Sequence, residues 1–100
     1  MSKVVFTVQY EIKEDQLNNY FQSIKEMKSL VKTEGLEQYS VYQVKGKKNT
    51  FAELFVFRNA EFYEQYEDNI DERLSVLLSK IETLKVHGTT RYTTQEELPE

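Results

Sequence analysis

The chain has 100 residues, of which 39% are hydrophobic and 30% are charged, a balance typical of one folded globular domain. It contains no cysteine, which excludes disulfides, thiolate metal sites and thiol nucleophiles together. The formal net charge of −4 argues against a nucleic-acid partner, because binding to phosphates needs a basic surface.

The first half of the chain predicts a strand followed by a helix. Residues 4–12 alternate between two sets of side chains, which is the period of a half-buried strand. Glu14 or Asp15 can then cap an amphipathic helix with one apolar stripe: Leu17, Tyr20, Phe21, Ile24, Met27 and Val31. Gly35 follows, where we expect a left-handed backbone at the end of the helix.

The second half predicts three strands and further helical segments. Residues 36–44 and 50–57 are rich in Tyr, Val and Phe and predict two strands joined by a hairpin loop. Asn59 can cap a short helix, and a longer helix carries Leu74, Leu77, Leu78, Ile81 and Leu84. Residues 85–93 predict a fourth strand. We therefore expect a single domain over residues 1–93, with a polar, frayed tail at 94–100.

This order, β-α-β-β-α-β, predicts an α+β ferredoxin-like fold with a four-stranded antiparallel sheet, strand order 4-1-3-2 and two helices on one face. A buried face should carry no unpaired polar group. We therefore assign Ala52, Leu54 and Val56 to the helix side, with the first-strand set Val4, Phe6, Val8, Tyr10 and Ile12. The helix-free face then carries Phe51, Glu53, Phe55 and Phe57. Such an aromatic patch needs cover, and this predicts a homodimer that pairs the two helix-free faces.

Two residues are candidates for catalysis, Glu53 and His87. A carboxylate among phenylalanines loses hydration, which raises its pKa; the alternative is that Glu53 forms an interface ion pair with Arg91 or Lys3. His87 is the only histidine, and its ordinary pKa lies near neutrality. It could equally bond to a neighbouring backbone group or carboxylate. With Gln9 and Arg91 on the same face, these side chains could converge across the sheet.

A mostly apolar cavity with a few polar groups is the usual form of a small-molecule site. The expected ligand-binding residues are Gln9, Phe51, Phe55, Tyr63, Tyr66 and Arg91, although the two tyrosines could equally belong to the core. One histidine with scattered carboxylates lacks metal-ligand spacing, so we expect neither a metal nor a cofactor. No apolar run approaches the roughly 20 residues of a membrane span, and we expect a cytoplasmic protein without a signal peptide.

The third-strand sequence Phe51-Ala52-Glu53-Leu54-Phe55-Val56-Phe57, the length and the element order resemble the dimeric α+β barrel superfamily, and within it the antibiotic-biosynthesis-monooxygenase-like proteins. The resemblance covers residues 4–93. It implies a homodimer with a cavity in each protomer and, for some members, oxidation of phenols or quinols by O₂ without metal or flavin. Phe55 stands where a Trp is common in that group. The chain has no Trp, which argues against haem degradation, another activity of the group.

Three functions remain open at this stage. The leading hypothesis is a small dimeric barrel that binds an aromatic or other hydrophobic molecule, with cofactor-independent monooxygenation of a phenol or quinol as its enzymatic form. There, Glu53 or His87 would accept the hydroxyl proton. The alternative is a non-catalytic ligand-binding or stress-associated dimer. An RNA-recognition domain shares the element order, but Glu53 stands where a base-stacking aromatic is expected.

Overall fold

The computed structural model describes residues 2–98. Within that range the chain forms four strands, three α-helices and two short 3-10 helices, in an order that confirms the predicted α+β class. Their bounds are β1 Val4–Glu11, η1 Glu14–Gln16, α1 Leu17–Leu30, β2 Leu36–Gln43, β3 Thr50–Phe57, α2 Ala60–Gln65, η2 Glu67–Asn69, α3 Glu72–Leu84 and β4 Arg91–Glu96.

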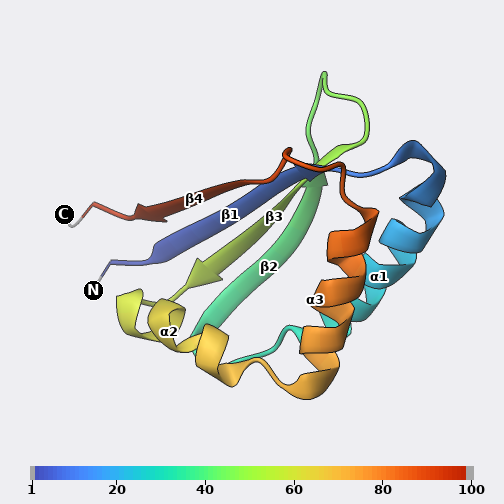
Figure 1. The fold of residues 1–100 in the computed structure, drawn as a ribbon. Coiled ribbons are helices and arrows are strands. Elements are labelled where there is room, and N and C mark those ends of the chain that lie inside the picture. Colours follow the sequence, from blue (N-terminus) through green and yellow to red (C-terminus); the bar gives the residue numbers. More distant parts are fainter. Residues whose placement is uncertain (1, 99–100) are drawn as a thin grey trace.

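The four strands form one antiparallel sheet in the order β2-β3-β1-β4, as the ferredoxin-like topology predicts. Figure 1 shows the helices gathered on one side of this sheet, with α1 and α3 next to each other and α2 near the end of β3. Among residues 2–98, no helix has the length and apolar composition to cross a membrane.

The register between β1 and β3 overturns our assignment of the third-strand faces. Val8 lies opposite Glu53, and Phe6 lies opposite Phe55. Paired residues on neighbouring strands share a face, so the set Phe51, Glu53, Phe55 and Phe57 points to the helices, together with the buried side of β1. The three phenylalanines are at most 4% exposed. The prediction that they lie on the helix-free face, and need a partner sheet to cover them, was wrong.

The helix-free face instead has a half-buried aliphatic centre on β3, formed by Ala52, Leu54 and Val56. By the strand register it also carries Val5, Thr7 and Gln9 from β1, Ser40 and Tyr42 from β2, and Arg91 and Thr93 from β4. This surface mixes aliphatic and polar side chains. It is therefore less hydrophobic than the phenylalanine row that we expected there.

Side-chain caps fix where two of the helices begin. The carboxylate of Asp71 accepts a hydrogen bond from the amide of Leu74 at the start of α3, and Asn59 accepts one from Phe62 at the start of α2, as predicted for Asn59. Neither Glu14 nor Asp15 caps α1. They form the 3-10 turn before it instead, and the residue at the N-cap makes no side-chain capping bond.

Two chain segments differ from their predicted positions. Gly35 has a positive φ of 83°, as expected, but it lies in the turn that enters β2 rather than directly after α1. The fourth strand begins at Arg91, because residues 86–90 form a turn with Gly88 at a φ of 78°. Thr94–Glu96, expected in the tail, pair with β1. Residues 99–100 of that tail lie outside the described residues.

Candidate functional site

A buried hydrogen-bond network surrounds Glu53 on the helix side of the sheet. The hydroxyl of Tyr39 donates to its Oε1 at 2.7 Å, and the hydroxyl of Tyr10 donates to its Oε2 at 2.9 Å. The hydroxyls of Tyr10 and Tyr20 are 2.8 Å apart. Because the single proton of Tyr10 points to Glu53, Tyr20 is the donor in this second bond. The register of β1, β2 and β3 thus places two hydroxyl donors, those of Tyr10 and Tyr39, within hydrogen-bond distance of the Glu53 carboxylate.

The network explains how Glu53 can be buried. The residue is only 6% exposed, and loss of hydration raises the pKa of its carboxyl above the ordinary value. The hydrogen bonds from Tyr39 and Tyr10, and the positive charge of Lys85, act in the opposite direction. Burial is the largest of these effects. In turn, burial and the nearby carboxylate raise the pKa values of the Tyr10 and Tyr39 hydroxyls, which therefore stay protonated as donors.

One side of Glu53 faces a cavity of about 420 Å³ between the sheet and the segment from α2 to α3. Its walls are mostly aromatic and aliphatic, with charged groups from the helical side. The lining residues are Phe6, Val8, Glu53, Phe55, Tyr63, Glu64, Tyr66, Glu67, Ile70, Leu78, Ile81, Glu82, Lys85 and Tyr92. This volume falls within the range of small-molecule pockets, and the mixture of many apolar and few polar groups is typical of them.

Aromatic contacts hold the walls of this cavity in place. The Phe6 ring lies at the centre of the group, with its centroid 5.6 Å from that of Phe55, 5.7 Å from that of Tyr63 and 6.1 Å from that of Tyr92. Tyr63 and Thr94 place their hydroxyls 3.1 Å apart, which connects α2 to β4. This hydrogen bond therefore links α2 to β4, the strand at the edge of the sheet next to the cavity.

Lys85 is the cation of this site. Its side chain is 9% exposed, its ammonium group lies 2.9 Å from Glu82, and the same nitrogen lies 4.4 Å from the centroid of the Tyr10 ring. The side chain thus packs between the hydrogen-bond network and the cavity wall. Its position balances part of the negative charge that Glu53 and Glu82 bring to the site.

The structure brings together some of the predicted site residues and separates others. Glu53, Phe55, Tyr63 and Tyr66 all line the cavity. Phe51 is buried elsewhere on the same side of the sheet, where its ring lies 4.6 Å from that of Tyr20.

The expected convergence of Gln9, Glu53, His87 and Arg91 does not occur. Gln9 and Arg91 are paired neighbours on the helix-free face, opposite to the side of Glu53. His87 is exposed in the turn before β4. The separation follows from the register. The odd-numbered residues of β1, such as Gln9, point to one face of the sheet, and Glu53 points to the other.

Sequence reasoning missed the two donors to Glu53, Tyr10 and Tyr39, and also Lys85 and Tyr92. Tyr10 was assigned to the helix side correctly, but its hydroxyl was not considered as a partner for a buried carboxylate. A tyrosine within an otherwise apolar buried strand is a usable signal, because its hydroxyl needs a hydrogen bond there. No comparable signal was available for Lys85, since its role depends on the path of the chain after α3.

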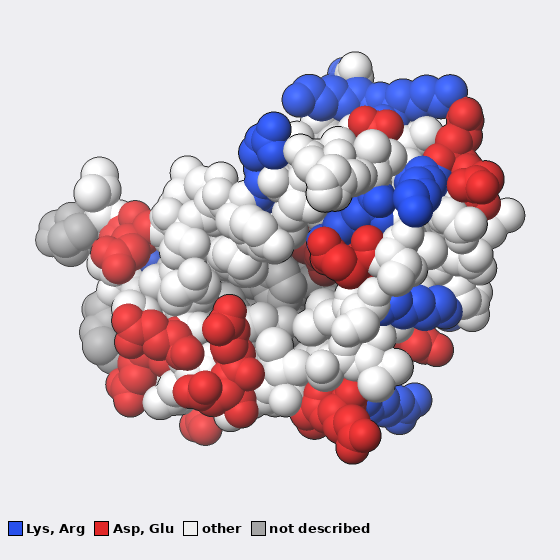
Figure 2. Space-filling model, in the orientation of Figure 1, with Lys and Arg blue, Asp and Glu red and all other residues white. Residues whose placement is uncertain are grey.

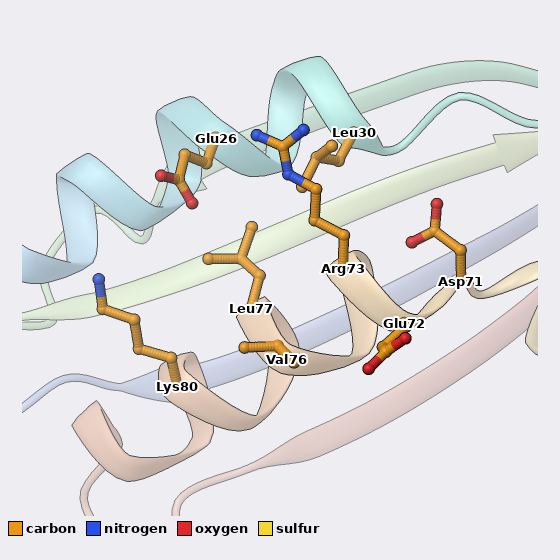
Figure 3. A pocket seen from close by; sticks show the side chains of 8 residues that line it. All are labelled: Glu26, Leu30, Asp71, Glu72, Arg73, Val76, Leu77 and Lys80. Atoms are coloured by element: carbon orange, nitrogen blue, oxygen red, sulfur yellow. The ribbon is translucent and has the colours of Figure 1, made fainter.

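A second depression lies on the outer surface of the helices and differs in character. Figure 3 shows it between α1 and α3, with Glu26 and Leu30 on one helix and Arg73, Leu77 and Lys80 on the other. It is open to solvent, its charged side chains include both signs, and none of its lining residues is a buried carboxylate like Glu53. The cavity under α2 and α3 is therefore the candidate functional site. Within the described range, no three side chains gather as a set of metal ligands.

No protein-family model matches the sequence, and a search of curated proteins found no relative. Solved structures do share its fold. A candidate antibiotic biosynthesis monooxygenase from Caulobacter crescentus superposes with a TM-score of 0.83 over 98% of this chain and 92% of that protein, at 6% identity. A dimeric ferredoxin-like protein from an uncultured marine organism has a TM-score of 0.76, at 15% identity over 100% of this chain and 91% of its own.

The third structure is SnoaB, a cofactor-independent oxygenase from Streptomyces nogalater. It aligns over 100% of both chains with a TM-score of 0.75 and 10% identity. The chain thus has the fold of the antibiotic-biosynthesis-monooxygenase-like and dimeric ferredoxin-like proteins over nearly its full length, and the resemblance suggested by the third strand is confirmed at the level of the fold. Identities this low concern architecture alone and carry no activity from one protein to another.

Proposed function

We propose that this protein binds a small aromatic or other hydrophobic molecule in the cavity under α2 and α3. The observation that carries the proposal is one wall on which a buried carboxylate, Glu53, stands beside a group of aromatic rings. Rings such as Phe6 and Phe55 offer apolar contact, and Glu53 offers a hydrogen-bond acceptor for a ligand hydroxyl. Each carboxylate oxygen already accepts one tyrosine hydroxyl and keeps a second lone pair.

The binding experiment uses 4-tert-butylphenol as a neutral probe and follows the tyrosine ring signals by NMR. In the Leu78→Trp variant the larger side chain fills the cavity, and we expect probe binding to be lost. Val76→Trp is the matched control, because Val76 lies on the same helix and is 66% exposed. Circular dichroism checks that both variants fold. Equal binding by the wild type and Leu78→Trp would contradict the proposal, as would the absence of binding by the wild type.

A second candidate is cofactor-independent monooxygenation, favoured by the burial of Glu53 beside the cavity and supported by the fold shared with SnoaB. Glu53 would accept the hydroxyl proton of a quinol, because the anion gives up an electron to O₂ more readily than the neutral molecule. One oxygen atom would enter the ring and the other would leave as water. The quinol supplies all four electrons and becomes a hydroxyquinone, so no added reductant is needed.

Oxygen consumption across a panel of quinols separates the two candidates. If the protein is an enzyme, turnover should exceed background and fall at least 100-fold in Glu53→Gln, while probe binding is retained. The matched control is Glu61→Gln, which removes an exposed carboxylate on the same helix α2 that does not line the cavity, and it should keep most of the turnover. If oxygen consumption stays at background across the panel, the enzymatic candidate fails and the binding proposal remains.

The protein is further proposed to act as a homodimer that pairs the helix-free faces. Support comes from the half-buried aliphatic centre of this face, Ala52, Leu54 and Val56, and from the shared fold with a protein described as dimeric. A second copy of the sheet would remove these side chains from water through a two-fold interface. Sedimentation equilibrium measures the mass directly. A monomer at micromolar concentration would contradict this part of the proposal.

A further inference from the structure

The ionisable groups around the cavity are unbalanced in charge. Four carboxyl groups line it, those of Glu53, Glu64, Glu67 and Glu82, against the single ammonium group of Lys85. Lys85 is already engaged by Glu82 at 2.9 Å. Among residues 2–98, none of the side-chain ion pairs includes Glu64 or Glu67. The two carboxylates on the α2 side are therefore uncompensated by a direct partner.

The wider surface has the same asymmetry. Figure 2 shows acidic side chains gathered at lower left, over the α2 region, whereas Lys and Arg lie mainly at the top, near the hairpin loop, and on the right, over α1 and α3, where acidic side chains lie among them. Tyr66 is partly buried, and the pKa of its hydroxyl is raised to about 12, first by this burial and then by the negative charges of Glu53 and Glu67. The cavity wall at Tyr66 thus lies in a negative potential.

The apolar walls of the cavity are also suited to a positive charge. Phe6, Phe55, Tyr63, Tyr66 and Tyr92 all line it. Aromatic faces carry a negative electrostatic potential and attract ammonium groups, most strongly when water is excluded. Several rings around one volume, with carboxylates at its rim, form the type of environment that recognises amines and quaternary ammonium groups.

We infer that the cavity is selective for organic cations, binding an amine or quaternary ammonium compound of aromatic or aliphatic character more tightly than neutral or anionic molecules of the same shape. This inference rests on the proposed binding function and names the ligand class. The apolar part of the ligand occupies the volume near Phe6 and Phe55. Its positive charge lies near Tyr63 and Tyr66, on the side where Glu64 and Glu67 stand.

Three probes of similar shape test the charge preference by NMR titration: 4-hydroxyphenyltrimethylammonium, 4-tert-butylphenol and 4-hydroxybenzoate. The first two differ in the replacement of a quaternary nitrogen by a quaternary carbon, so their shapes match and their charges differ. We expect the cation to bind at least fivefold more tightly than the neutral probe at low salt, and the anion to bind least. Added salt should weaken the cation preference, because exposed carboxylates supply much of it.

The double variant Glu64→Gln/Glu67→Gln removes the two rim charges without removing the side chains. A carboxylate charge at ~8 Å from the positive charge of the ligand, in a solvent-exposed setting of effective dielectric ~60, changes the affinity for the cation about threefold. Loss of both carboxylate charges should therefore lower this affinity roughly tenfold. The matched control is Glu61→Gln/Asp68→Asn, which makes the same change in net charge on α2 and η2 at residues that do not line the cavity. Its effect on cation affinity should stay below threefold. The neutral probe should change less than twofold in either variant.

Each outcome decides one point. Tighter binding of the cation, lost in the rim variant and kept in the control, supports the inference. Equal affinities for the cation and the neutral probe overturn it while leaving the binding proposal intact. A cation preference that persists in the rim variant overturns the assignment to Glu64 and Glu67. If none of the three probes binds, the proposed binding function fails together with the inference.

Discussion

Replacing Tyr39 by Phe tests the hydrogen-bond network around Glu53. The variant keeps the ring, which lies 4.8 Å from that of Phe55, and removes the hydroxyl that donates to Glu53 Oε1 at 2.7 Å. A hydrogen bond to a charged group contributes about 1.5–3 kcal/mol, and a neutral one about 1 kcal/mol. At pH 4 the raised pKa keeps the carboxyl of Glu53 protonated, and we expect a loss of about 1 kcal/mol in the free energy of unfolding. The loss should rise toward about 2 kcal/mol at higher pH, as the carboxyl ionises.

The assay is urea unfolding at pH 4 and at a series of higher pH values. It uses one fixed protein concentration, because dimerisation would make stability depend on concentration. For a chain of this length, 2 kcal/mol corresponds to a fall of about 10 °C in Tm. Tyr42→Phe is the matched control, since Tyr42 lies on the same strand, is 52% exposed and faces away from Glu53. A loss that does not depend on pH, or that equals the loss in Tyr42→Phe, would refute the proposed role of the network.

Three further predictions follow from particular residues. In Gly35→Ala, the new Cβ would lie 2.0 Å from Phe62, on a residue whose φ is 83°. We therefore expect a loss of at least ~3 kcal/mol in the free energy of unfolding, or no folded protein. The control is Gly46→Ala, where φ is 86° but no atom lies within 4 Å of the new Cβ, and urea unfolding should show a loss of only about 1 kcal/mol. The pKa of Glu53 is raised above its ordinary 4.5 in the folded state, so its contribution to stability is full below that pH and declines as the pH rises through the folded pKa. Glu53→Gln should lack this decline, and an unchanged pH profile would contradict the assignment. Leu54→Glu, at the centre of the helix-free face, should shift the mass by sedimentation from dimer to monomer with the circular dichroism spectrum retained, and an unaltered mass would count against that interface.

The period of the hydrophobic residues was sufficient to predict the order of the elements, and with it the fold class and the strand order. The resemblance to a known fold depended in addition on the third-strand sequence and the length of the chain. It could not assign the faces of β3, because both faces of Phe51–Phe57 are mostly apolar. Alternation along a strand separates two sets of side chains but does not show which set faces the helices. The rule that a buried face excludes a carboxylate placed Glu53 on the wrong side. That rule fails when donors are present, and here Tyr10 and Tyr39 supply them from the neighbouring strands.

The bounds of β4 were missed for a different reason. All six of its residues are exposed, so Arg91–Glu96 shows no alternation of buried and exposed side chains. The apparent strand pattern at residues 85–90 is a turn with Gly88 in the left-handed region. Of the candidate site, Glu53, Phe55, Tyr63 and Tyr66 could be named from the sequence pattern. Their meeting in one cavity depends on register and on the packing of α2, which local sequence does not specify.

The location of a bound ligand tests the central claim most directly. The tert-butyl protons of 4-tert-butylphenol give one sharp NMR signal, and nuclear Overhauser effects from it identify the rings that it contacts. The account predicts such effects to Tyr66 and Phe55, which line the cavity under α2 and α3. Effects to Tyr42 on the helix-free face instead, or none to the cavity rings at saturating probe, would contradict it.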